Sequence, residues 1–147
     1  MVAWFQGGAE FGPRALGNRS FLADPRSAEM GARINAKIKQ REPFRPFAPS
    51  IKEERLAEYF DLHQPCPFMN IVAPVLEAKR HELAAVTHVD ATARVQTVSR
   101  QANERFWLLL DAFEACSGVP VLLNTSFNIQ EPIVNTPTRG DPHLPAQ

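Results

Sequence analysis

Hydrophobic and polar positions fall into blocks that predict both strands and helices. Short apolar runs predict strands at residues 2–5, 21–23, 68–76 and 119–123, and an alternating run predicts another at residues 93–98. The first run leads into glycines and is predicted to be buried. Because strands and helices are interspersed along the chain, the pattern predicts an α/β or α+β fold with a mixed sheet.

Three segments have helical patterns, at residues 28–39, 50–60 and 103–116. The first is predicted to start at Asp24-Pro25, with Asp as the cap. Ser50 and Glu53 have the spacing of a capping box, which places the second start at Ser50. Gly118 is predicted to end the third helix. The charged residues 77–85 are predicted to form an exposed loop.

A proline-rich segment separates the first two helices. Its three prolines recur every third residue between 43 and 49, which excludes a helix and favours extended backbone. This stiff frame holds Lys39, Arg41 and Arg45. Cations on a rigid backbone lose less entropy when they bind a ligand than cations on a flexible tail do.

Residues 6–20 are the most distinctive stretch of the chain. They contain four of its seven glycines and two arginines, Arg14 and Arg19. Glycines allow close backbone approach, and arginines offer paired donors to carboxylates or phosphates. The stretch is therefore either an anion-binding loop at a strand end or a surface turn with solvated arginines.

Composition limits the remaining possibilities. The 147 residues suit one domain, and 16 basic residues balance 16 acidic ones. Zero net charge predicts no nucleic-acid partner. No apolar run approaches the ~20 residues that span a bilayer, so no membrane partner is predicted. The two cysteines form no CxxC motif, and we expect a cytoplasmic location.

Common catalytic motifs are absent, including the P-loop and the zinc-protease motif. His63 and Cys66 supply too few ligands for a zinc site. His88 and Asp90, near Arg94, either orient a substrate or hydrogen-bond a loop. Basic and polar residues recur where strands end, namely Arg14, Arg19, Lys39, Arg45, Arg94, Asn124, Thr125 and Ser126. Such a set suits a nucleotide phosphate or a carboxyl-phosphate anhydride.

Six ordered motifs carry a resemblance to a known family: EFGPRALGNRS at residues 10–20, ADPR at 23–26, NAKIK at 35–39, FRPFAP at 44–49, THVDATARVQ at 87–96, and VPVLLNTSFN at 119–128 followed by EPIV at 131–134. The chain resembles the C-terminal domain of the carbamoyltransferase family, which includes nodulation-factor and antibiotic O-carbamoyltransferases. The resemblance covers residues 1–137, and residues 138–147 are predicted to be a disordered tail. The domain is predicted to be truncated at both ends. Gly7-Gly8-Ala9 replaces a bulkier residue usual in the family, so we expect a looser loop there.

The resemblance implies a YrdC-like domain, a twisted open mixed α/β sheet with flanking helices. It implies that carbamoyl phosphate and ATP, with Mg²⁺, are converted to carbamoyl adenylate. A metal-carrying ASKHA-type domain would then transfer the carbamoyl group to a sugar or antibiotic hydroxyl, and we expect that domain in another chain or outside this sequence. The resemblance assigns catalytic roles to Lys39, Arg45 and Arg94. It assigns ligand binding to these three and to Arg14, Asn124 and Ser126, and no metal site to this chain.

Two alternatives stay open. The chain could be a non-catalytic remnant that binds nucleotide or docks to a partner. It could also bind RNA, as other YrdC-like domains resemble RNA-binding proteins, although its zero net charge argues against this.

Overall fold

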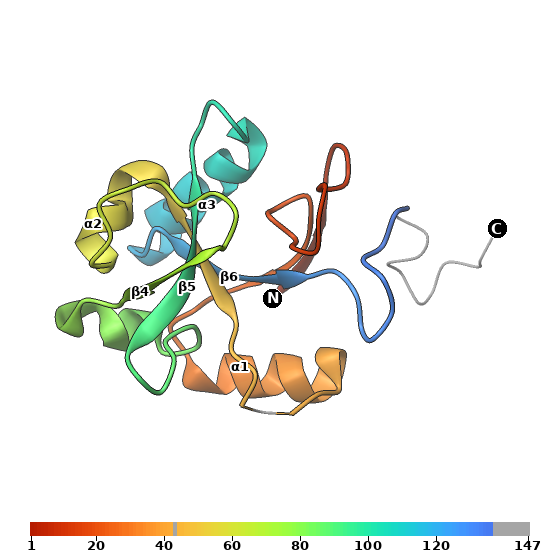
Figure 1. Cartoon of the computed structure of the whole chain (residues 1–147), viewed down its shortest axis with the longest axis horizontal. Helices are drawn as coiled ribbons and strands as arrows, with labels where there is room; N and C mark the ends of the chain where they lie inside the picture. Colours follow the sequence, from red (N-terminus) through yellow and green to blue (C-terminus); the bar gives the residue numbers. More distant parts are fainter. Residues whose placement is uncertain (43, 137–147) are drawn as a thin grey trace.

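The computed structural model describes residues 1–42 and 44–136. The described part of the chain forms an open six-stranded sheet with helices packed against it (Figure 1). The strands are β1 (Val2–Phe5), β2 (Arg19–Ala23), β3 (Ala48–Lys52), β4 (Ile71–Pro74), β5 (Thr92–Val98) and β6 (Val121–Ser126). The α-helices are α1 (Ala28–Ile34), α2 (Leu56–Tyr59) and α3 (Glu104–Ser117). A π-helical turn (Asn35–Lys39) and 3-10 helices (Glu53–Arg55, Glu77–Leu83) complete the set. The predicted tail, residues 138–147, lies outside the described residues.

The sheet is mixed. Its strand order is β1-β2-β6-β3-β5-β4, and among these pairs only β3 and β5 run parallel. Strands β2 and β6, from opposite ends of the described chain, pair with each other as the second and third strands of this order. The predicted mixed α/β sheet is therefore confirmed.

Successive side chains of β6 pack into two different apolar clusters. Val121 and Leu123 pack in the larger cluster, with Ile34 of α1. Leu122 packs in the smaller cluster with Phe106 and Leu110 of α3. Because neighbouring residues of a strand point to opposite faces, α1 and α3 cover opposite faces of the sheet.

Helix α3 follows its prediction closely. Asn103 is the cap, and its side chain accepts a hydrogen bond from the backbone N–H of Phe106 at 3.2 Å. Gly118 ends the helix in the left-handed conformation, with φ of 78°, and its N–H donates to the carbonyl of Glu114. Both ends of α3 are set by local capping residues, which can be recognised in the sequence.

The predicted helix start at Ser50 is wrong. Ser50 lies inside β3, which is paired on one side with β6 and on the other with β5. Its hydroxyl donates to Oε1 of Gln96 at 2.5 Å instead of capping a helix. Strand pairing on both sides of β3, together with complete burial of Ile51, outweighs the local capping pattern. Helical structure starts only at Glu53.

The helix predicted over residues 28–39 starts at Ala28 as predicted, but Asp24 is not its cap. Ser27 occupies the N-cap position without a side-chain capping hydrogen bond, and Asp24 forms an ion pair with Arg26 at 2.6 Å. The α-helix ends at Ile34 and continues as the π-helical turn Asn35–Lys39. Gln40 then reverses the chain with a positive φ of 46°. π-helical turns of this kind often occur near functional sites.

The ends of the sheet show smaller departures. Strand β1 is an edge strand with exposed Val2, so the prediction that it is buried is wrong. Strand β4 covers only part of the predicted residues 68–76, and the predicted loop at 77–85 contains the 3-10 helix Glu77–Leu83. Strand β6 starts and ends later than predicted and includes Asn124 and Ser126.

Among the helices described, none has the length and apolar character needed to cross a bilayer.

Candidate functional site

A small cavity of about 90 Å³ lies where β6 ends and β3 begins. We call it the arginine cavity. It is lined by residues 13–15, Arg41, residues 46–48, Met69, Arg94 and residues 124–126. Four of the predicted ligand-binding residues meet here: Arg14, Arg94, Asn124 and Ser126. No carboxylate is among the described residues that line it.

The cavity carries positive charge, and no acidic side chain is among the described residues that line it. Arg94 is half-buried, and its Nε is buried without a hydrogen-bond partner among the described residues. Burial lowers the pKa of Arg94, and the charges of Arg14 and Arg41 lower it further. Mutual repulsion of three guanidiniums is unfavourable unless an anion offsets it, so the cavity is suited to an anionic group.

Arg41 was grouped with Lys39 and Arg45 in the stiff proline-rich segment, but the resemblance did not assign it to the site. Its Nε donates to Oδ1 of Asn35 at 2.8 Å, and its guanidinium lies 4.9 Å from the ring centre of Phe47. Burial lowers the pKa of Arg41, with a further decrease from Arg45 and a smaller opposing effect of Glu42. The only sequence signal was its place between two selected cations. Its contact with Asn35 depends on the π-helical turn, which the sequence pattern did not predict.

Lys39 is buried, and its ammonium group is held by oxygens of residues at and just after the end of β6. Its Nζ donates to the carbonyl of Ser126 at 2.5 Å and the carbonyl of Asn128 at 2.9 Å. It also reaches Ser126 Oγ at 3.1 Å and Asn128 Oδ1 at 2.8 Å. Burial, followed by the charge of Arg41, lowers the pKa of Lys39 to about 8. The four oxygens favour the ammonium form, so at neutral pH Lys39 is a charged group that fixes the end of β6.

Arg45 lies outside the arginine cavity. Its side chain is exposed and pairs with Glu42, with Nε 3.0 Å from the carboxylate. It lines a neighbouring polar groove of about 630 Å³, together with Lys39, Arg41, Ser126 and Asn128. Because Arg41 and Ser126 line both spaces, the groove and the arginine cavity are adjacent. Arg45 is therefore placed to meet a ligand that extends into the groove.

The glycine-rich stretch folds over one end of the site. Glu10 Oε1 accepts hydrogen bonds from the backbone N–H groups of Leu16 and Asn18, both at 2.7 Å. Arg19 is buried, donates to the carbonyls of Gln6 and Gly7, and stacks 3.5 Å from the ring centre of Phe5. Arg19 thus shapes the loop, while Arg14 lines the cavity.

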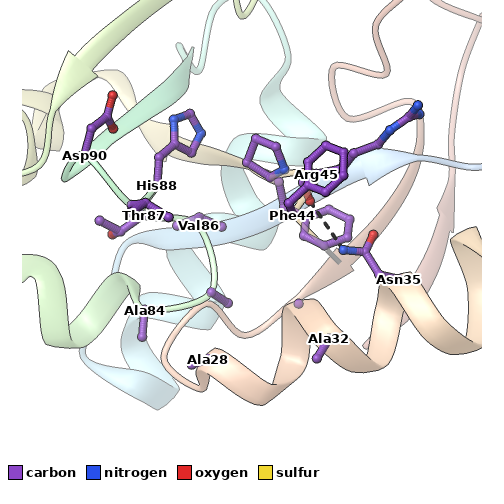
Figure 2. A pocket seen from close by; sticks show the side chains of 15 residues that line it. Ala28, Ala32, Asn35, Phe44, Arg45, Ala84, Val86, Thr87, His88 and Asp90 are labelled. Carbon is purple, nitrogen blue, oxygen red and sulfur yellow. Dashed lines mark hydrogen bonds between the residues drawn. The ribbon is translucent and has the colours of Figure 1, made fainter. Parts of the chain in front are cut away.

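A larger, mostly apolar hollow of about 670 Å³ lies between α1 and residues 84–90 (Figure 2). Small side chains of α1 form one wall, and Phe44 stands at another. Residues 45–47 border it and also line the groove or the arginine cavity. Figure 2 shows the Arg45 side chain extending away from the hollow.

His88 closes the loop beside this hollow. Its Nδ1 lies 3.1 Å from the hydroxyl of Thr92, which donates to Asp90 at 2.6 Å. Since that hydroxyl proton is directed to Asp90, Nδ1 is the donor to Thr92. Burial lowers the pKa of His88, an effect that Asp90 opposes. Through these contacts His88 and Asp90 stabilise the loop, and both also line the hollow.

Metal ligands do not gather in the described part of the chain. It contains no group of three or more His, Cys, Asp or Glu side chains that could hold an ion. Cys66 is buried and contacts the carbonyl of Val95, whereas exposed His63 lies 3.5 Å from Asp61.

Sequence comparison identifies the family. Residues 1–140 match the family model described as Carbamoyltransferase C-terminus. The chain belongs to this family. This bears out the resemblance based on the six motifs.

All six residues that the resemblance assigned to the site line the arginine cavity or the adjacent groove. Among them, Arg45 forms an ion pair with Glu42.

Several carbamoyltransferase relatives are much longer than this chain. It is 59% identical over 140 residues to nodulation protein NolNO of Sinorhizobium fredii, with 92% of this chain and 21% of the relative covered. It is 56% identical to nodulation protein NolO of Bradyrhizobium diazoefficiens, with 92% and 26% covered. It is 49% identical to 3'-hydroxymethylcephem-O-carbamoyltransferase of Amycolatopsis lactamdurans, with 87% and 24% covered. The chain thus spans about a fifth to a quarter of these relatives.

Proposed function

We propose that this domain forms carbamoyl adenylate from carbamoyl phosphate and ATP, as the C-terminal part of an O-carbamoyltransferase. One observation carries the proposal: Arg14, Arg41 and Arg94 surround a small cavity whose described lining has no carboxylate. Substrates with phosphate groups would offset this charge. Arginines also stabilise the charge that develops on a phosphoryl group during transfer.

The spaces around the cavity fit the parts of the two substrates. A cavity of about 90 Å³ suits a phosphoryl or carbamoyl group, and the adjacent groove of about 630 Å³ leaves room for a longer polyphosphate. The apolar hollow beside residues 45–47 has the size and lining for a nucleobase. Because the described residues offer no cluster of metal ligands, Mg²⁺ would be held mainly by ATP phosphates, as is common for this ion.

Atom balance defines the reaction. Water must cleave carbamoyl phosphate to carbamate and phosphate, so that a carbamate oxygen can bond to the α-phosphorus of ATP and release pyrophosphate. Arg14, Arg41 and Arg94 would bind and neutralise the phosphoryl groups. Lys39 would act through Ser126 and Asn128, by fixing the cavity wall at the end of β6. Arg45 would contact the part of the substrate that lies in the groove.

Transfer to the final acceptor is assigned to another part of the enzyme. The family resemblance suggests a metal-carrying ASKHA-type domain that passes the carbamoyl group to a sugar or antibiotic hydroxyl. The relatives' additional length is consistent with such a domain. The YrdC-like character of the present domain is part of the same proposal.

A non-catalytic nucleotide-binding or docking role is the second candidate. It is favoured by the hydrogen bonds that occupy Lys39, because these leave that cation without a donor directed to substrate. Release of pyrophosphate separates the two candidates, since a binding module retains affinity for ATP without turnover. RNA binding would instead show as salt-sensitive affinity for RNA.

Titration calorimetry with carbamoyl phosphate and with ATP tests the proposal. Arg94→Ala should weaken the binding of both by about 10-fold to 100-fold, because it removes a charged donor from a partly buried site. Arg33→Ala, on the exposed side of α1, is the matched control and should bind as the wild type does. Equal affinity of Arg94→Ala and wild type would reject the site. Pyrophosphate release in the presence of both substrates tests the reaction itself.

A further inference from the structure

Three polar side chains form a buried cluster under the arginine cavity. Ser50 of β3, Gln96 of β5 and Asn124 of β6 are 0%, 3% and 1% exposed. They come from three adjacent strands, and Ser50 is directly paired with Gln96 in the sheet. Buried polar groups are unfavourable unless all their hydrogen bonds are made, so an incomplete cluster points to a missing partner.

Backbone contacts fix the orientation of this cluster. Gln96 Nε2 donates to the carbonyl of Leu16 at 2.7 Å. A carbonyl only accepts, so the amide nitrogen of Gln96 must point to Leu16 and its oxygen must point to the other two residues. That oxygen accepts from the Ser50 hydroxyl at 2.5 Å and from Asn124 Nδ2 at 2.9 Å.

Asn124 is consequently left with an unused acceptor. Its Nδ2 also donates to Ser50 Oγ at 3.0 Å, so both amide protons are engaged. Turning the amide over would place its oxygen against Gln96 Oε1, and two acceptors at that distance repel. Asn124 Oδ1 therefore stays on the other side, buried without a hydrogen-bond partner in the described chain. Asn124 lines the arginine cavity, where a ligand can supply the missing donor.

We propose that Asn124 Oδ1 accepts a hydrogen bond from the N–H₂ group of the carbamoyl ligand, and that Gln96 and Ser50 are positioning residues that hold it in this orientation. The inference rests on the proposed function and adds the basis of substrate selection. The arginines recognise phosphate in any acyl phosphate, whereas Asn124 distinguishes an amide from a methyl group. An acyl phosphate without N–H leaves Oδ1 unsatisfied, which disfavours its binding.

Acetyl phosphate provides the matched probe, because it has a methyl group where carbamoyl phosphate has an amino group. Calorimetry should give at least about a tenfold preference of the wild-type protein for carbamoyl phosphate over acetyl phosphate. Gln96→Leu and Asn124→Leu should bring this ratio close to one. Ser50→Ala, a smaller change, should lower the ratio partly and serves if the leucine variants do not fold. Gln64→Leu, at an exposed position, should keep the wild-type ratio.

Inorganic phosphate separates the possible failures. If the wild type binds phosphate and both acyl phosphates equally well, the inference is wrong and the anion site stands. A preference that persists in Gln96→Leu, Ser50→Ala and Asn124→Leu also rejects it. If none of the three anions binds to the wild type, the proposed function fails together with the inference.

Discussion

At the scale of single residues, Lys39 shows how burial changes the role of a charge. A lysine in a basic motif is predicted to be a ligand-binding cation. The Nζ of Lys39, however, is hydrogen-bonded to four oxygens of Ser126 and Asn128. Deleting it would leave those acceptors without their donor. We therefore expect its loss to affect stability and the shape of the site before it affects any direct contact with substrate.

Lys39 predicts a specific dependence of stability on pH. Its pKa falls from 10.5 to about 8 on folding, so the unfolded chain holds this proton more tightly. Deprotonation between these two values therefore favours the folded state, and the Lys39 contribution to stability rises by about 1–2 kcal/mol from pH 8 to pH 9.5. Denaturant unfolding of wild type and Lys39→Met at pH 8 and pH 9.5 measures this rise in unfolding free energy. The variant should not show the rise, because it lacks the titrating amine.

Two features set the conditions of that measurement. Burial and the contact with Glu82 raise the pKa of Tyr59, so its ionisation destabilises the fold above pH 10, outside the chosen range. Lys37→Met, at an exposed position of the same turn, is the matched control and should retain the wild-type increment. An identical pH response of Lys39→Met and wild type would show that the ammonium is not held in this environment.

At the scale of elements, the glycine-rich loop is constrained at one position. Gly17 has φ of 108°, and the ring of Phe106 from α3 occupies the space that a Cβ would need. A looser loop was expected at Gly7-Gly8-Ala9, and a Cβ added at Gly8 would meet no atom within 4 Å. The contact between Gly17 and α3 thus fixes the loop whose carbonyl at Leu16 orients Gln96.

Gly17→Ala should destabilise the domain by about 2–4 kcal/mol, because it combines an unfavourable backbone angle with overpacking of a buried ring. Gly8→Ala should change the unfolding free energy by less than about 0.5 kcal/mol. Thermal or denaturant unfolding gives both values. Adding Phe106→Leu to Gly17→Ala should recover part of the loss, and strict additivity of the two changes would contradict direct contact.

The same elements show which parts of the structure the sequence could predict. Helix α3 was predictable because its cap, apolar stripe and terminal glycine are local signals. Strand β3 was not predictable in this way, since Ser50 and Glu53 have the spacing of a helix capping box. Pairing of β3 with β5 and β6 outweighs that local signal. In the site, the motifs placed Arg14, Arg94 and Asn124 at one cavity. Gln96 was missed because its role depends on a contact with Leu16, 80 residues away in the chain. Arg41 was not assigned to the site because only the fold brings it to the same cavity as Arg14 and Arg94.

At the scale of the whole molecule, the sheet is open at both edges. Strand β1 forms one edge with Met1 and Val2, which are 58% and 53% exposed, and β4 forms the other with Val72, which is 56% exposed. Edge strands present unpaired backbone groups, and exposed apolar side chains beside them favour pairing with another chain. The molecule is therefore expected to associate through an edge of this sheet.

Light scattering at increasing protein concentration tests this expectation, and the average mass should rise with concentration. Val2→Lys places a charge on the outer strand and should shift association to higher concentration, because a charge at an edge opposes strand pairing. Ala78→Lys, an exposed change outside β1 and β4, is the matched control and should associate as the wild type does. A single mass throughout would mean that the open edges do not pair. Equal association of the two lysine variants would place the contact away from β1, and the same experiment with Val72→Lys would then test the opposite edge.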